Sequence, residues 1–161
     1  MSSSFSEEEL ETFFVGAPES IGHVRERFSP FEYFRPGEVD LSRIMADLLN
    51  PEGSHRCADR FLLSFLACIS ETRFGDAMKA ATVRLNDPTE DGRLIDITVS
   101  SDQFILGIEN KPWAREGRKQ VTDYLQDLRR KKTANGYKLL YLSGDGSSPP
   151  SLKPEEEEVR I

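Results

Sequence analysis

The sequence predicts an α/β domain with a mixed β-sheet, and three observations predict this class. Helical periodicity over 38–73 is followed by segments that alternate between apolar and polar residues. Two of these segments, 93–100 and 103–111, are close enough in sequence to pair as a hairpin. A further helical segment, 116–132, then precedes one more strand-like segment, 137–143, and this alternation is typical of α/β folds.

The length and composition indicate one soluble domain. A chain of 161 residues corresponds to a single domain, so we expect one over 1–161 with its core at about 31–145. No apolar run approaches the about 18 residues of a membrane span, and the first residues lack the pattern of a signal peptide. We therefore expect a cytoplasmic protein without a membrane partner. Cys57 and Cys68 are then expected to be free thiols, with Cys68 buried on a helix.

The net charge is -7, but the charge is unevenly placed. Residues 111–138 carry nine basic and three acidic residues, so a basic segment lies within an acidic chain. An acidic protein is not a generic nucleic-acid binder. The basic segment is either a solvated helix face or a local interface for nucleic acid, and charge alone leaves both open.

The N-terminal half is predicted to be mainly helical. A capping-box pattern predicts a short helix over 6–15, and a Gly-, Pro- and aromatic-rich connection follows over 16–37. Apolar residues at helical spacing predict helices over 38–50 and 56–73. Residues 81–86 are expected to form the first strand.

The predicted hairpin places Ser101 and Asp102 in a tight turn. If residue 100 pairs with residue 103, one face of the hairpin is wholly apolar, because the following residues oppose each other: Ile95 with Ile108, Ile97 with Leu106, and Val99 with Phe104. After the helix over 116–132 and the strand over 137–143, we expect a loop and the first residues of a truncated strand in 146–161.

The other face of the hairpin carries two acids and an amine. In the predicted register Asp96 lies opposite Gly107, and Glu109 is its diagonal neighbour at about 7–8 Å. Two carboxylates at that separation can share a divalent ion such as Mg²⁺, and Gly107 is expected to leave room beside them. Lys111, two residues beyond Glu109, can orient a water or stabilise developing charge. The alternative is ordinary polar decoration of a strand.

Residues on the flanking helices extend this pattern. Glu38 lies close to the apolar stripe of its helix and is a possible further metal ligand, although an acid in a first helical turn also favours the helix dipole. Gln120 and Tyr124 are four residues apart and share a helix face. His55 is either a phosphate contact or a residue of a loop or a helix N-terminus, and Trp113 either stacks on a base or lies at a rim or in the core.

With these motifs the sequence resembles the PD-(D/E)XK nuclease superfamily. The resemblance covers about residues 31–145, and the Gln-x-x-x-Tyr element is similar to that of the RecB-like exonuclease branch. The stretches around 38–43, 48–55 and 108–114 resemble an uncharacterised bacterial and phage subgroup. The resemblance implies a restriction-endonuclease-like αβββαβ core, a mixed sheet flanked by helices. Ile95 stands where the family name has proline.

The resemblance also implies residue roles. Asp96, Glu109 and the main-chain carbonyl of Asn110 are expected to bind Mg²⁺, with Mn²⁺ as a substitute, and Lys111 to assist attack on the phosphodiester. Glu38, Gln120 and Tyr124 complete the expected catalytic set. The expected nucleic-acid contacts are His55, Arg115, Arg118, Lys119, Arg129 and Arg130.

We therefore expect a metal-dependent nuclease acting on DNA, with RNA left open as a substrate. The alternative is a non-catalytic module on the same fold that binds nucleic acid or protein. A homodimer, or a subunit of a larger defence or repair assembly, is also compatible with the sequence.

Overall fold

The structure is a computed structural model, and it describes residues 33, 35–71, 80–113, 117, 119–131, 136–151 and 159–160. All helices and strands within these ranges belong to the unit Pro36–Ile161. The helix predicted over 6–15 lies outside the described residues.

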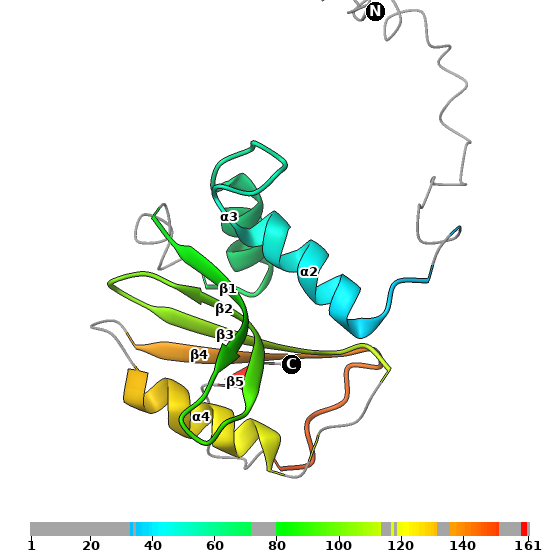
Figure 1. Ribbon diagram of the computed structural model, residues 1–161, viewed down its shortest axis with the longest axis vertical. Helices are drawn as coiled ribbons and strands as arrows, with labels where there is room; N and C mark the ends of the chain where they lie inside the picture. The colour runs from blue at the N-terminus through cyan, green and yellow to red at the C-terminus, as the bar shows by residue number, and fades with distance from the viewer. Residues whose placement is uncertain are drawn as a thin grey trace, which may run out of the picture. The chain divides into compact units, whose positions relative to one another are not determined.

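The sheet has five strands in the order β1-β2-β3-β4-β5 (Figure 1). β1 (Thr82–Pro88), β2 (Leu94–Ser100) and β3 (Ile105–Lys111) form an antiparallel meander. β4 (Tyr137–Ser143) pairs parallel to β3, and β5 (Val159–Arg160) pairs parallel to β4. The predicted α/β class with a mixed, restriction-endonuclease-like sheet is therefore confirmed.

Helices cover both faces of this sheet (Figure 1). α2 (Glu38–Leu49) and α3 (Arg60–Cys68) pack on one face, and α4 (Gln120–Lys131) packs on the other. No helix in the described ranges is long and apolar enough to span a membrane.

Two of the predicted helices are shorter than their apolar pattern suggested. α3 starts at Arg60 because Arg56 and Ala58 have positive φ values of 56° and 50°, and Ser70, at 59°, lies just beyond its end. α4 starts at Gln120 because Lys119 has a φ of 58°. Residues in the left-handed region do not continue a right-handed helix.

Each face of the sheet has its own hydrophobic core. The α2–α3 face buries Leu49, Leu62, Leu66, Ile97 and Leu106, among others. The α4 face buries Ile95, Val121, Leu125, Leu128 and Leu139. Each fully buried leucine or isoleucine contributes about 1.5–3 kcal/mol, so both helical layers are held firmly against the strands that carry the polar residues.

The register of the β2–β3 hairpin differs from the prediction by two residues. Val99 pairs with Leu106, and Ile97 pairs with Ile108. The turn is longer than the predicted two residues because the Ser101 N–H donates to the Phe104 carbonyl at 2.9 Å. A shift of two residues keeps every side chain on its face. The observed register places Thr98 opposite Gly107. Continued past the pair of Ile97 and Ile108, the same register sets Asp96 beside Glu109.

The prediction that Ile95 shares a face with Ile97 is wrong. Ile95 packs in the core under α4, whereas Ile97 packs in the core under α2 and α3. The pairing of β1 with β2 passes from Leu85↔Ile97 to Asp87↔Ile95, and Asn86 between them has a positive φ of 50°. β2 therefore changes faces at Asp96, and this carboxylate is free to turn toward the edge of β3.

Two smaller predictions are also corrected. Gly107 does not leave room beside the acids, because a Cβ there would lie 3.0 Å from Leu128 and 3.2 Å from Leu139 in the α4 core. Both cysteines are free thiols, but Cys68 is exposed rather than buried. Cys68 lies two residues beyond the buried Leu66, which places it on the outer side of α3.

Candidate active site

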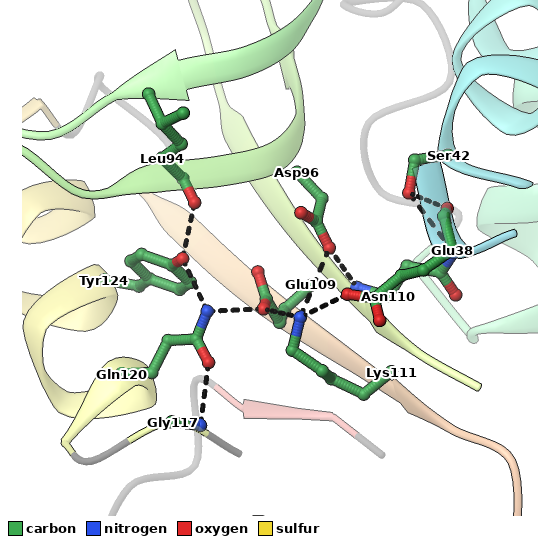
Figure 2. Close-up of polar contacts among 10 residues, drawn as sticks. All are labelled: Glu38, Ser42, Leu94, Asp96, Glu109, Asn110, Lys111, Gly117, Gln120 and Tyr124. Atoms are coloured by element: carbon green, nitrogen blue, oxygen red, sulfur yellow. Dashed lines mark hydrogen bonds and ion pairs between the residues drawn. The ribbon is translucent and has the colours of Figure 1, made fainter. Parts of the chain in front are cut away.

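The C-terminal end of β3 supplies the centre of the candidate site (Figure 2). Glu109 and Lys111 are two residues apart and share one side of the strand. The Glu109 side chain is fully buried, and its Oε1 lies 2.6 Å from the Lys111 Nζ. Asp96 approaches from β2, with its Oδ2 4.0 Å from the same Nζ. The two carboxylates thus meet around one ammonium group.

Asp96 is held in place by the backbone of β3. Its Oδ2 accepts a hydrogen bond of 2.8 Å from the main-chain N–H of Asn110. The Asp96 carboxylate thus occupies the place where a main-chain carbonyl of β2 would accept the Asn110 N–H, because β2 changes faces at Asp96. The Asp96 carboxylate is consequently fixed beside Glu109 by a donor that belongs to the main chain of β3 and not to a flexible side chain.

Glu38, the first residue of α2, brings a third acid to Lys111. Its Oε1 lies 2.6 Å from the Lys111 Nζ. The helix end that carries Glu38 is tied to β3 by Asn110, whose Nδ2 donates to Ser42 Oγ at 3.2 Å. Ser42 Oγ in turn donates to the main-chain carbonyl of Glu38 at 3.0 Å. This link positions Glu38 relative to the strand (Figure 2).

Sequence reasoning did not identify the role of the Asn110 and Ser42 side chains. Asn110 lies between Glu109 and Lys111 in sequence, so its side chain faces the opposite side of β3, toward α2. Ser42 is buried and lies four residues after Glu38, on the same helix face. A polar residue on each of two facing apolar surfaces was the pattern that could have revealed the pair.

Gln120 and Tyr124 of α4 hold Glu109 from the other side. The Gln120 Nε2 donates to Glu109 Oε1 at 2.6 Å and to the Tyr124 hydroxyl at 2.8 Å. The Gln120 Oε1 accepts from the Gly117 N–H at 3.0 Å. The Tyr124 hydroxyl then donates to the Leu94 carbonyl at the start of β2. The six residues predicted as catalytic are therefore brought together: Glu38, Asp96, Glu109, Lys111, Gln120 and Tyr124.

Burial shifts the protonation equilibria of the site. It raises the pKa of Glu109 to about 7, against the opposing hydrogen bond from Lys111. It also raises the pKa of Asp96, and the N–H of Asn110 partly offsets that effect. Burial lowers the pKa of Lys111, but hydrogen bonds to Glu109 and Glu38 outweigh it, so the net shift is upward. Burial raises the pKa of Tyr124 to about 12, so the phenol keeps its proton.

The donor set is suited to a hard divalent cation. Three carboxylates surround one ammonium, which leaves an excess of negative charge when all are ionised. The Oε2 of Glu109 is buried without a hydrogen-bond partner, and an orphaned buried carboxylate oxygen is costly unless a cation meets it. In the described ranges no three His, Cys, Asp or Glu side chains converge as metal ligands. Mg²⁺ requires only one or two carboxylates, because waters and substrate phosphate complete its octahedron.

The predicted nucleic-acid contacts do not all join this cluster. Arg115 and Arg118 lie outside the described residues. Lys119 is exposed and directly precedes α4. The two ring nitrogens of His55 contact the loop between α2 and α3, with Nε2 at 3.0 Å from the Asn50 carbonyl and Nδ1 accepting from the Cys57 N–H at 3.0 Å.

The basic residues at the C-terminal end of α4 are paired with acids and a tyrosine of the same chain. Arg130 Nε lies 3.0 Å from Glu90, and the Lys131 Nζ lies 2.8 Å from the buried Asp127. Arg129 donates to the Tyr137 hydroxyl at 2.5 Å. Arg130 thus fastens α4 to the loop between β1 and β2, and Arg129 fastens it to β4, whereas the Lys131–Asp127 pair lies within α4. Binding a phosphate there requires these cations to leave their partners.

Comparison with known proteins assigns the family. The family model of the PD-(D/E)XK nuclease superfamily matches residues 28–161, and the chain therefore belongs to this superfamily. Its members are generally nucleases, which act on nucleic acid and typically use divalent metals. No curated protein and no solved structure matches the chain significantly.

Proposed function

We propose that this protein is a Mg²⁺-dependent nuclease that hydrolyses phosphodiester bonds of DNA, with Mn²⁺ as a substitute ion. The observation that carries the proposal is the fully buried Glu109, whose Oε2 has no hydrogen-bond partner and which lies beside Asp96 and Lys111. An ordinary structural carboxylate on a strand is solvated or fully hydrogen-bonded. A buried carboxylate with one oxygen that lacks a hydrogen-bond partner is suited to bind a cation.

The metal ligands in this proposal are Asp96, Glu109 and the main-chain carbonyl of Asn110, with Glu38 at the rim of the site. A bound Mg²⁺ supplies Lewis acidity toward a phosphoryl oxygen and lowers the pKa of a coordinated water. Gln120 and Tyr124 act on Glu109, because Gln120 holds its Oε1 by a hydrogen bond and Tyr124 holds Gln120, which would leave the Glu109 Oε2 available to a cation.

Lys111 supplies positive charge where the phosphoryl oxygens gain negative charge. Its side chain is only 11% exposed, and carboxylates from α2 and β3 hold its Nζ. A preorganised ammonium in a water-poor site stabilises developing charge more than one in bulk water does. The strong upward shift of its pKa keeps it protonated over the working pH range.

Phosphate contacts in this proposal come first from the basic residues that precede α4, namely Arg115, Arg118 and Lys119. Lys119 directly precedes Gln120, whose side chain contacts Glu109, and Arg115 and Arg118 are included from their place in the sequence alone. Arg129 and Arg130 are secondary candidates, because Arg130 already contacts Glu90, Asp91 and Asp127. His55 is kept as a remote candidate only.

The second candidate function is a non-catalytic module that binds nucleic acid or protein. The observation that favours it is that the Lys111 ammonium lies between the three acids of the described site and already balances part of their charge. Among the described residues no group of three His, Cys, Asp or Glu side chains is arranged to hold a metal ion. A protein of this kind would bind its partner without a divalent ion.

One pair of measurements separates the two functions. Calorimetry with Mn²⁺ and cleavage of circular and linear DNA are compared for the wild type and for Asp96→Asn. We expect wild-type binding and cleavage and the loss of both in Asp96→Asn. Asp102→Asn is the matched control, because Asp102 is an exposed acid in the β2–β3 turn, and it should retain both. Cleavage that persists unchanged in Asp96→Asn would refute the proposal.

A further inference from the structure

A groove of about 650 Å³ opens beside the candidate active site. Its walls are the segment from Lys111 to Trp113, at the end of β3, and the loop that follows β4. Because Lys111 belongs both to the groove and to the acid cluster, a molecule in this groove lies next to the groups assigned to hydrolysis. The groove has no role in the mechanism proposed above.

Trp113 is the most conspicuous residue of this groove. It is the only tryptophan of the chain, and 69% of its surface is exposed although it lies two residues from Lys111. An exposed aromatic ring that lines a groove offers a flat apolar face on which a planar ligand can stack.

The two walls of the groove are fixed against each other. A Cβ on Gly144 would lie 2.0 Å from the Pro112 carbonyl oxygen, so only glycine permits the loop after β4 to approach the residue before Trp113 this closely. Within that loop Ser143 Oγ donates to the Ser147 carbonyl at 3.0 Å, and the Ser147 N–H donates to Asp145 Oδ1 at 2.9 Å. The groove is therefore preformed, and a ligand pays little ordering entropy to use it.

The chemistry of the lining does not suit a phosphate backbone. Lys111 is the sole cation among the described lining residues, and carboxylates already contact its ammonium. Asp145 adds an acid to the wall. Ser143, Ser147 and Ser148 add hydroxyl groups, which both donate and accept hydrogen bonds. An aromatic face combined with small hydroxyl groups matches a nucleobase, which stacks and presents polar edges.

We propose that this groove holds an unpaired base of single-stranded DNA, stacked on Trp113, next to the phosphodiester bond that is cleaved. The proposal rests on the proposed nuclease function and specifies its substrate class. A base within a duplex is already stacked and paired, and its extraction costs a few kcal/mol. The protein should consequently prefer single strands, overhangs or gaps to blunt duplex ends.

The binding test uses the full chain with Ca²⁺ in place of Mg²⁺ to prevent turnover. Because Trp113 is the only tryptophan, its fluorescence should be quenched by a short single-stranded oligothymidylate and much less by a blunt duplex of equal length. Anisotropy of a labelled oligothymidylate should show an affinity about 5- to 150-fold weaker for Trp113→Ala, the usual loss for one stacked base. Trp113→Phe should keep most of the affinity.

Phe61→Ala is the matched control, because Phe61 is a partly exposed aromatic residue of α3 that does not line this groove. It should bind the oligonucleotide like the wild type. Equal losses on the single strand and on the blunt duplex would overturn the selection of an unpaired base. No quenching, together with wild-type affinity in Trp113→Ala, would overturn the groove assignment altogether.

Cleavage assays with Mn²⁺ separate this proposal from the nuclease function on which it rests. If cleavage depends on Asp96 but is equal on single-stranded and blunt duplex DNA, the nuclease function stands and the base groove is refuted. If no DNA is cleaved and the oligothymidylate does not bind, both proposals are refuted. Preferred cleavage of the single strand, lost in Trp113→Ala and retained in Trp113→Phe, is the expected result.

Discussion

The pKa of Glu109 predicts that the candidate site destabilises the metal-free protein, and Glu109→Gln measures by how much. Folding raises this pKa from 4.5 to about 7 because the carboxylate is buried. The folded state therefore holds the Glu109 proton more tightly than the unfolded chain does. The resulting cost to stability is absent below pH 4.5, grows as the pH rises toward 7, and is complete above 7. Glutamine removes the charge while keeping the shape.

The magnitude follows from the two pKa values. One pKa unit corresponds to about 1.4 kcal/mol, so the full cost above pH 7 is about 3 kcal/mol. Glu109→Gln should raise the free energy of unfolding by about 1–3 kcal/mol at pH 8 and by less than about 0.5 kcal/mol at pH 4. The attraction of Lys111 is already contained in this value, since it lowers the Glu109 pKa.

Urea unfolding in EDTA, followed at pH 4, 6 and 8, provides the assay. The control is Asp102→Asn, which removes an exposed carboxyl of the β2–β3 turn outside the candidate site. A Glu109→Gln variant that is no more stable than the wild type at pH 8 would show that the carboxylate is solvated. The orphaned Oε2 of Glu109 would then not require a cation.

Four further predictions concern the surroundings of the site. Lys111→Ala should abolish cleavage yet retain Mn²⁺ binding by calorimetry, because an ammonium is not a metal ligand; normal cleavage would remove Lys111 from the chemistry. Gly144→Ala should lower the free energy of unfolding by about 1–3 kcal/mol through its clash with Pro112, whereas Gly37→Ala, with its nearest atom at 3.5 Å, should not show this clash. Ser42→Ala should cost about 1–2 kcal/mol in urea unfolding, because the buried Asn110 amide loses its hydroxyl partner; wild-type stability would contradict that link. Arg118→Ala/Lys119→Ala should reduce the log–log salt slope of duplex DNA affinity by about 0.9 for each lost phosphate contact, and an unchanged slope would exclude both residues from the interface.

The period-two pattern of the strands was sufficient to bring Glu109 and Lys111 together. It does not depend on the exact register, so the hairpin prediction placed both on one side of β3 even though it was wrong by two residues. The register itself depended on the turn, and the Ser101 side chain, which accepts hydrogen bonds from the N–H groups of Gln103 and Phe104, closes a longer turn than the sequence suggested.

The exact position of Asp96 could not be predicted from periodicity, because β2 breaks its alternation there. The break coincides with the positive φ of Asn86 on the neighbouring strand, and a single sequence does not reveal such a tertiary irregularity. The ion pairs of Arg130 were hidden for a related reason. Two of its three acids, Glu90 and Asp91, come from the loop between β1 and β2, far from α4 in sequence.

The attachment of α2 to β3 has a consequence for how this site can evolve. The helix end is joined to β3 by two links, one through Ser42 and Asn110 and the other through the Glu38 carboxylate and Lys111. The link through Ser42 and Asn110 only attaches α2 to β3, whereas the Glu38 carboxylate also contributes charge to the candidate active site. A substitution of the acid at position 38 removes the link through Lys111 and leaves the link through Ser42 and Asn110, so we expect that charge to be open to change by single substitutions while the helix keeps its attachment.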